Sequence, residues 1–253
     1  MKIIYILLFS LVNSFLIFSQ TGSFTDIRDG RVYSTTTIGY QTWMGDNLMA
    51  VTFRNGDPIP NASTSEAWES AKKKGKPAWC YYDNRSVQDD PINGNKYGIL
   101  YNWYAVSDPR GLAPEGWHIA SDAEWTTLAN QLGGKELAGI KLKSENSWGV
   151  KSYIGWQSNF TVNCGGDNSS GINALPGGYC HNGIFLYLGA EGRWWSSTET
   201  VPFSKKNKTS GRAIFFQLLE CPIGDPDRLK TQEQLFRGED VQDDGYSVRC
   251  VKN

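Results

Sequence analysis

Helical and strand patterns fall in different parts of this chain, and that separation limits its fold class more than any other feature. Two helix starts precede residue 140, and each pairs a capping side chain with an acid three residues later: Ser63 with Glu66, and Ser121 with Glu124. Beyond residue 140 the strand patterns dominate, as at 212–219 and 246–251. Helices early and strands late indicate an α+β domain rather than alternating β-α units.

Two further segments can be assigned locally. Residues 24–48 favour an opening hairpin, with β-branched and aromatic residues on both sides of Gly39. Residues 97–104 form a short apolar run that fits either a buried strand or a turn of helix, and its length does not decide between them.

The amino terminus has the pattern of an export signal. Lys2 precedes an apolar run from Ile3 to Phe18, and the small polar residues that follow place cleavage after Gln20. A membrane anchor is the alternative, but about 16 apolar residues are short for a span of ~20. We therefore expect a signal peptide at 1–20 and one domain at 21–253, without a transmembrane segment in the mature chain.

Composition limits the partners. The formal net charge is −1, which excludes an electrostatic attraction to nucleic acid, while ten Trp, twelve Tyr and eleven Phe supply a large aromatic core. The five cysteines contain no C-x-x-C pair, and export makes disulfides their default state. Their spacing does not fit a zinc site, and an odd count leaves at least one thiol unpaired or intermolecular.

No catalytic motif stands out. The chain contains no H-E-x-x-H, no G-x-S-x-G and no glycine-rich phosphate loop. His118, between Trp117 and Ile119, is more typical of a histidine that packs or hydrogen-bonds near the core than of a catalytic base. The sequence therefore predicts a protein that is not an enzyme.

A set of short motifs spread over the whole mature chain carries a resemblance. The motifs are Asp29-Gly30-Arg31-Val32-Tyr33, Ile38-Gly39-Tyr40-Gln41-Thr42-Trp43-Met44, Asn47-Leu48, Tyr97-Gly98-Ile99-Leu100-Tyr101-Asn102-Trp103, Gly116-Trp117-His118, Ser121-Asp122-Ala123-Glu124-Trp125, Ala174-Leu175-Pro176-Gly177-Gly178, Trp194-Trp195-Ser196-Ser197-Thr198-Glu199 and Ser247-Val248-Arg249-Cys250-Val251. Together they resemble the Fibrobacter succinogenes major paralogous domain. The combination is far more specific than any one motif.

The resemblance implies a bacterial surface or periplasmic protein with a fold similar to C-type lectin domains and to the formylglycine-generating enzyme. On that basis we expect a C-type-lectin-like α+β domain with two short helices, small antiparallel sheets and long loops. The family has no established activity, so the fold alone does not assign a function.

The resemblance also bears on the cysteines. Many family members have a cysteine where this chain has Ala113, so the expected partner of Cys250 is missing, and Cys80 is its natural substitute. A second disulfide is expected among the remaining three cysteines, with Cys164 and Cys180 as the preferred pair. Formylglycine-generating chemistry uses a nearby cysteine pair late in the chain, whereas here Cys221 and Cys250 stand apart in strand-like segments.

A ligand surface is expected in the irregular second half. In lectin-like domains this surface is most often built by the long loops and the strands before the last one, here 201–245. The candidate ligand-binding residues combine aromatic faces with polar groups: Trp194, Trp195, Glu199, Phe216, Gln217, Asp225, Asp227 and Arg228. At least one tryptophan of the pair is also expected to be structural.

Metal binding stays open. The Asp167-Asn168-Ser169-Ser170-Gly171 run has oxygen donors but not the spacing of an EF-hand, so no cofactor is expected and calcium remains a candidate. The Glu-Pro-Asn and Trp-Asn-Asp signatures of calcium-dependent sugar-binding lectins are missing from the sequence.

The resulting hypothesis is a secreted or outer-membrane-associated binding module, without catalysis, that recognises an envelope or extracellular protein or a glycan. Its location would be the cell surface, the periplasm or the medium. Two alternatives remain: an enzyme of the formylglycine-generating type or an unknown hydrolase, and a structural subunit of an outer-membrane complex.

Overall fold

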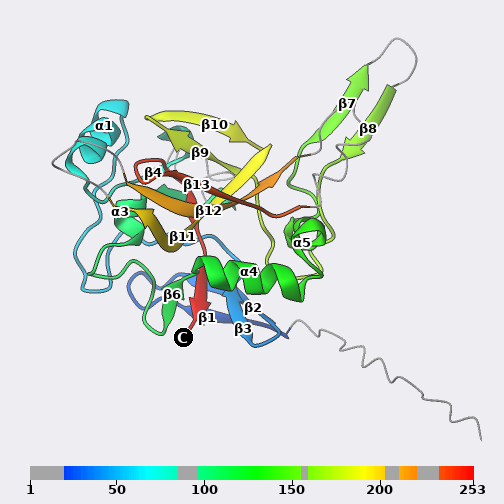
Figure 1. The fold of residues 1–253 in the computed structure, drawn as a ribbon, viewed down its shortest axis with the longest axis horizontal. Helices are drawn as coiled ribbons and strands as arrows, with labels where there is room; N and C mark the ends of the chain where they lie inside the picture. The colour runs from blue at the N-terminus through cyan, green and yellow to red at the C-terminus, as the bar shows by residue number, and fades with distance from the viewer. Residues whose placement is uncertain (1–19, 85–95, 155–158, 203–210, 221–233) are drawn as a thin grey trace, which may run out of the picture.

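The computed structural model describes residues 20–84, 96–154, 159–202, 211–220 and 234–253, so all but the last residue of the expected signal peptide lies outside it (Figure 1). The expected α+β class is confirmed. Within the described residues four α-helices occur rather than the two expected: α1 (Ser65–Lys74), α3 (Trp103–Val106), α4 (Asp122–Gln131) and α5 (Lys135–Leu142). A 3-10 turn, η1, covers Tyr82–Asn84.

A five-stranded sheet joins the two ends of the domain. Its order is β1 (Gln20–Thr25), β2 (Val32–Ile38), β3 (Gln41–Met44), β15 (Cys250–Lys252) and β6 (Trp117–Ile119). The predicted opening hairpin is β2 and β3, turning at Gly39 with φ 61°. On β15, Val251 pairs with Trp43 on one side and with His118 on the other, so the last strand closes the sheet.

The second sheet lies above the first in Figure 1 and has six strands. Its path is β10 (Ile184–Leu188), β9 (Gly177–His181), β11 (Glu191–Val201), β12 (Arg212–Leu219) and β13 (Phe236–Val241), with β14 (Ser247–Val248) paired to β11. The register sets Arg193 opposite Gln217 and Trp195 opposite Phe215. Because strand side chains alternate, Arg193 and Trp195 share one face of this sheet and Trp194 lies on the other.

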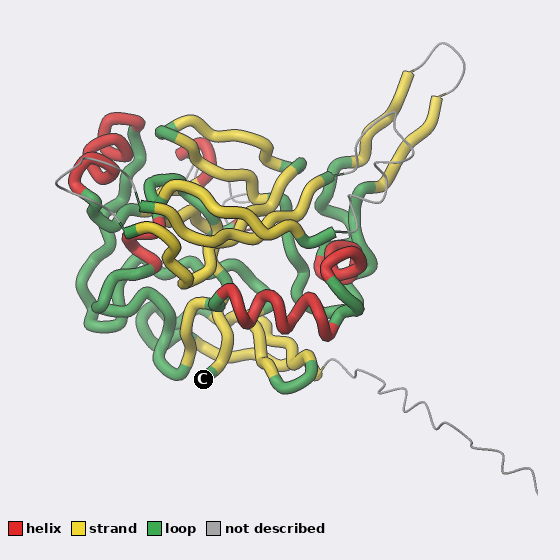
Figure 2. The backbone as a smooth tube through the Cα atoms, in the orientation of Figure 1, coloured by secondary structure: helices red, strands yellow, loops and turns green. Residues whose placement is uncertain are grey.

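Two small sheets complete the fold. One pairs β4 (Trp79–Tyr81) with β5 (Ile99–Tyr101), and β5 leads directly into α3, so the 97–104 run contains both a strand and a helix turn. The other pairs β7 (Val150–Ile154) with β8 (Asn159–Asn163) and projects from the body of the molecule (Figure 2).

Helix α4 begins as its sequence indicates. Ser121 accepts a hydrogen bond from the Glu124 amide at 3.3 Å, and a Glu124 carboxylate oxygen accepts one from the Ser121 amide at 2.8 Å. Helix α1 begins one residue later than expected, because Thr64, not Ser63, accepts from the Ala67 amide. Helix α5 was not predicted, since its N-cap is Gly134 and makes no side-chain cap.

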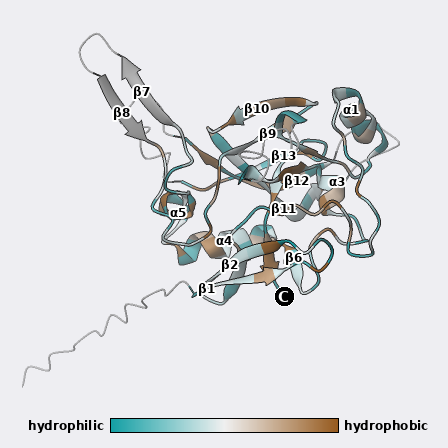
Figure 3. Ribbon diagram, turned by 180° about the vertical axis from the view of Figure 1, so that it is seen from behind, coloured by the Kyte–Doolittle hydropathy of each residue, from teal (hydrophilic) through white to brown (hydrophobic). Residues whose placement is uncertain are grey.

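Helix α4 lies between the two large sheets and shows both hydrophobic and hydrophilic residues along its length (Figure 3). The Trp125 ring is 4.8 Å from that of Trp43 on β3 and 5.2 Å from that of Phe216 on β12. One aromatic side chain therefore joins the two sheets, as expected for the apolar face of an amphipathic helix.

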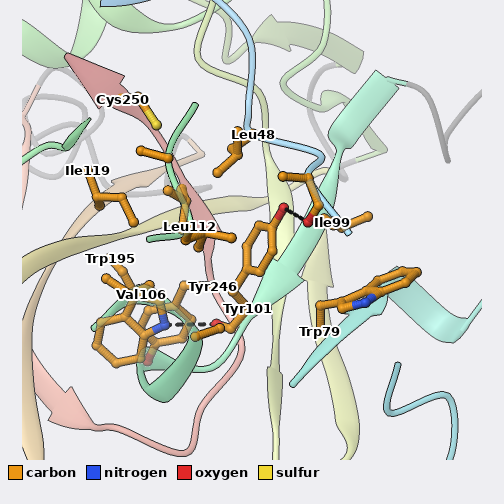
Figure 4. Packing of buried hydrophobic residues seen from close by; sticks show 14 of the residues in the cluster. Leu48, Trp79, Ile99, Tyr101, Val106, Leu112, Ile119, Trp195, Tyr246 and Cys250 are labelled. Atoms are coloured by element: carbon orange, nitrogen blue, oxygen red, sulfur yellow. Dashed lines mark hydrogen bonds between the residues drawn. The ribbon is translucent and has the colours of Figure 1, made fainter. Parts of the chain in front are cut away.

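A second cluster fills the space around β5 (Figure 4). The Tyr101 hydroxyl donates to the Ala50 carbonyl at 2.8 Å, and the Trp195 indole donates to the Tyr101 carbonyl at 2.9 Å. Both polar groups thus have a hydrogen-bond partner inside the core, which offsets the cost of removing them from water.

Candidate binding face

The double tryptophan is part of the core on both sides of β11. Trp194 is 1% exposed and donates to the Asn47 side-chain oxygen at 2.8 Å, whereas Trp195 is 0% exposed. Phe216 is 3% exposed and stacks on Trp125. These three side chains have no free face for a ligand, which corrects the prediction that they stack on one; the aromatic pattern reflects burial on two faces of a covered sheet.

A buried polar hub explains why several motif residues are polar. The Arg249 guanidinium donates to the Asn47 side-chain oxygen at 2.8 Å, to the Met44 carbonyl at 3.0 Å and to the Ile172 carbonyl at 2.8 Å. Burial lowers the pKa of Arg249 to about 10, because the charge is fully removed from water. These residues hold the fold together.

Two other predicted residues do reach the surface. Glu199 is exposed and accepts a hydrogen bond from the Gln242 amide group at 2.8 Å. Gln217 is half-buried and donates to Glu191 at 2.8 Å. Asp225, Asp227 and Arg228 lie outside the described residues.

Gln217 belongs to a group of side chains on one surface, here called the Arg193 face: Tyr179, Tyr187, Glu191, Arg193 and Gln217. The Arg193 guanidinium lies 3.7 Å from the centre of the Tyr179 ring. The Tyr187 ring stacks on the same Tyr179 ring, with the two ring centres 5.9 Å apart. Arg193 also pairs with Glu191 at 3.0 Å. Burial alone would lower the pKa of Arg193, but Tyr246 and Glu191 outweigh it and raise the pKa. The Arg193 guanidinium, with 14% of its side chain exposed, is thus packed among the rings of Tyr179, Phe215 and Tyr246.

Carboxylates border this face. The Tyr246 hydroxyl donates to Asp240 at 2.6 Å and lies 3.2 Å from Asp244, while His181 contacts Asp244 at 2.8 Å. Burial, and then the negative charge of Asp240, raises the pKa of Asp244 to about 6. The border is thus an electrostatic network whose charge changes in mildly acidic solution.

The edge strand β10 extends the face with exposed apolar side chains. Ile184 is 61% exposed, Tyr187 54% and Leu188 37%, and no described strand other than β9 pairs with β10. Natural edge strands are commonly protected by charged residues or proline. Within β10 neither occurs, so the strand exposes apolar side chains, although the Leu188 amide already donates to the Tyr82 hydroxyl at 3.4 Å.

The sequence analysis did not identify the Arg193 face, although one local pattern could have. Asn182 and Gly183 have φ of 51° and 76° and join β9 to β10, as in a two-residue hairpin of the I′ type. An Asn-Gly pair between apolar runs is a strong hairpin pattern, and it would have placed Tyr179 near Tyr187.

The predicted cysteine pairs are not formed. Cys80, Cys180 and Cys250 are all buried free thiols. Cys250 lies on β15 in the cluster with Leu48 and Ile119, whereas Cys80 lies in another cluster, together with Cys180. The chain ends are joined by the β3-β15-β6 ladder instead of a Cys80–Cys250 bridge, and the free state of Cys180 rules out the Cys164–Cys180 pair in this structure.

The remaining candidates have structural partners. His118 contacts Glu124 at 2.6 Å and Asn253 at 2.7 Å, which ties the start of α4 to the carboxyl terminus. Asp167 accepts from the Ser169 amide at 2.9 Å, as a turn-forming side chain does. Among the residues that the structure describes, no group of three or more His, Cys, Asp or Glu side chains could hold a metal ion.

A separate concavity of about 190 Å³ lies between the start of β2, the segment after β3 and the segment that precedes β5. Motif residues Tyr33, Asn47 and Gly98 are part of its lining. Asn47 is already bonded to Trp194, Arg249, Tyr97 and Ser247, so its polar atoms are committed to the core. The more available chemistry is that of the Arg193 face.

The geometry therefore defines an α+β protein with a polar structural hub and an aromatic, charged surface. The chain belongs to the Fibrobacter succinogenes major domain family, whose model matches residues 36–252. This confirms the resemblance seen in the motifs. No curated protein and no solved structure matches the chain. None of the helices in the described parts of the chain has the length and apolar character needed to cross a membrane.

Proposed function

We propose that this protein is an exported binding module, without catalysis, that recognises a protein partner through the Arg193 face and β10. The observation that carries the proposal is the set of exposed apolar side chains on an edge strand, directly beside an arginine stacked on tyrosine. Protein interfaces are enriched in tyrosine and arginine, and their centres are apolar.

The amino-terminal apolar run supports export, which would place the partner on the cell surface, in the periplasm or outside the cell. A lectin-like architecture and an outer-membrane association belong to the same proposal and rest on the motif resemblance. A protein is favoured over a glycan because Ile184 and Leu188 are aliphatic, and aliphatic side chains offer little to sugar hydroxyls.

The geometry suggests how a partner would bind. An extended segment could add to the free edge of β10 by main-chain hydrogen bonds, with side chains resting on Tyr187 and Ile184. The stacked guanidinium of Arg193 and the acidic border would then choose among partners, because unmatched charges at an interface are costly.

The test compares two exposed tyrosines. Immobilised mature protein (21–253) is incubated with envelope and secreted fractions, and bound proteins are quantified for wild type, Tyr187→Asn and Tyr40→Asn. Tyr187 has φ 61°, which asparagine adopts readily, and Tyr40 is 78% exposed near the first sheet, away from the face. We expect a specific partner to be lost at least about tenfold with Tyr187→Asn and retained with Tyr40→Asn.

Equal retention by both variants would contradict the assignment of the face. A glycan array run with the same three proteins covers the other ligand class. Binding to a glycan that depends on Tyr187, without any protein partner, would replace the protein hypothesis with glycan recognition.

A further inference from the structure

Two buried thiols from distant parts of the chain lie against each other. Cys80 on β4 is 1% exposed and Cys180 on β9 is 0% exposed, and both belong to the cluster that contains Trp68, Ala78 and Leu100. Burial, and then the neighbouring Cys180 thiol, raises the pKa of Cys80 well above its usual value. Both thiols are free in this structure, and a disulfide would bring their sulfur atoms to about 2.05 Å from each other.

Neighbouring strands hold the two cysteines in this position. Cys180 exchanges both backbone hydrogen bonds with Gly245, at 2.9 and 2.8 Å. The next residue, Tyr246, exchanges both with Tyr101 at 2.9 and 3.0 Å, and Tyr101 lies on β5, where Leu100 pairs with Cys80. A continuous ladder therefore connects the backbones of the two cysteines.

Close packing at Gly245 reinforces this arrangement. A Cβ atom there would lie 3.0 Å from the Cys180 Cβ and 2.9 Å from the Trp68 ring. A glycine at this position leaves room for the Trp68 ring and the Cys180 side chain, which both belong to the cluster that contains Cys80.

We propose that Cys80 and Cys180 form a disulfide when the chain folds in an oxidising compartment. The site is a modification site, and its co-reactant is the disulfide of a thiol–disulfide oxidoreductase or of oxidised glutathione. One cysteine thiolate attacks that disulfide and releases one thiol. The second cysteine thiolate then attacks the mixed disulfide and releases the other, so two electrons and two protons pass to the oxidant.

The order of events follows from burial. Both thiols are inaccessible once the cluster has closed, so exchange with an external disulfide takes place before α1 covers the site with Trp68. The finished bond would close a loop of about 100 residues and link the first half of the domain to the six-stranded sheet. The cellular part of this inference rests on the proposed export, whereas the pairing itself rests on the packing.

The experiment refolds the mature protein in an oxidised or a reduced glutathione buffer. Unreacted thiols are then alkylated in denaturant, and peptides are mapped by mass spectrometry. The expected result is a linked peptide pair containing Cys80 and Cys180 in the oxidised sample, with Cys250 alkylated. The oxidised protein should melt roughly 5–15 °C above the reduced protein.

Cysteine variants show which thiols cause the difference in melting temperature between the oxidised and the reduced protein. Cys80→Ala and Cys180→Ala should each abolish the part of the oxidised-to-reduced melting shift that this bond supplies, whereas Cys250→Ala, which removes an equally buried thiol, should keep it. If the alanine variants do not fold, the peptide map of the wild type decides alone. Alkylation of both cysteines in the oxidised sample, or a link from either one to another cysteine, would overturn the pairing.

A separate measurement isolates the export question. The same alkylation is applied to protein taken directly from the native host. A linked pair in vitro together with free thiols in the host would show that the chain folds in a reducing compartment, which contradicts export but leaves the pairing intact.

Discussion

Two arginines in this molecule show how the same side chain can serve the fold or a surface. Arg249 is 0% exposed and donates to the neutral oxygens of Asn47, Met44 and Ile172. Arg193 keeps 14% of its side chain exposed, pairs with Glu191, stacks on Tyr179 and donates to the Tyr246 hydroxyl at 3.1 Å. Burial lowers the pKa of the first, and the groups around the second raise its pKa.

The two arginines differ in what happens to their hydrogen-bond acceptors when the side chain is removed. Two of the hydrogen bonds of Arg249 go to the buried carbonyls of Met44 and Ile172, which lose this donor if Arg249 is removed, whereas the Asn47 oxygen keeps the Trp194 indole. Glu191 keeps a second donor, Gln217, if Arg193 is removed. The hub is therefore fixed by the fold, while the Arg193 face can change its partners.

Replacing Arg249 should have the largest effect. Arg249→Met should lower the free energy of unfolding by about 3–5 kcal/mol, because the buried Met44 and Ile172 carbonyls lose this donor. Chemical denaturation of Arg249→Met and of Arg31→Met, which removes a more exposed arginine, measures this. Equal losses of unfolding free energy for the two variants would contradict the claim that the buried hydrogen bonds of Arg249 stabilise the fold more than a surface arginine does.

The raised pKa of Asp244 in the acidic border should make the free energy of unfolding depend on pH. The pKa of Asp244 is raised from 3.8 to about 6, so the folded state holds a proton more tightly than the unfolded chain. Stability contributed by this group is present below about pH 4 and is lost as the pH rises through about 6. Asp244→Asn should therefore gain up to about 3 kcal/mol relative to wild type between pH 4 and pH 8.

That comparison needs a matched background. Repeating it in His181→Gln leaves a single ionisable group in the contact between the two side chains. Parallel pH profiles for the aspartate and asparagine proteins would contradict the raised pKa.

A smaller effect on stability is expected at Arg193. Arg193→Gln should lower the free energy of unfolding by about 1 kcal/mol, since Glu191 keeps its bond to Gln217. Capture of the partner should fall at least about tenfold in the same protein. A large loss of stability would place Arg193 with Arg249 and end the distinction between them.

The smallest effect on stability is expected at Tyr187. Tyr187→Asn should change the free energy of unfolding by less than about 0.5 kcal/mol, because the ring is more than half exposed and asparagine tolerates the positive φ. Thermal melting of this variant beside Tyr40→Asn checks it, and a drop of several degrees in the first protein alone would indicate that the ring supports the fold.

The sequence analysis succeeded where the interactions are local. Ser121 and Glu124 are three residues apart, so the start of α4 could be read directly, whereas α5 begins at Gly134, which offers no capping side chain. The burial of Trp194 and Trp195 depends on α4 and β5, which lie far away in sequence. The pattern of β11 alone could not separate stacking on a ligand from packing on two faces.

Cysteine pairing failed for the same physical reason. The backbones of Cys80 and Cys180 are connected by strand pairing through Gly245 and Tyr246. No sequence pattern near either cysteine predicts this pairing. Among the predicted ligand-binding residues, Glu199 is exposed and Gln217 is half-buried, so their proposed role in binding stays a prediction.

Site-specific photo-crosslinking tests the central claim most directly. A photoreactive amino acid replaces either Ile184 on β10 or Tyr40 at the first sheet, and both proteins are irradiated with the captured partner. We predict a crosslink to that partner from position 184 and none from position 40. A crosslink from position 40 alone, or equal yields from both positions, would contradict the assignment of the Arg193 face and β10 as the binding surface.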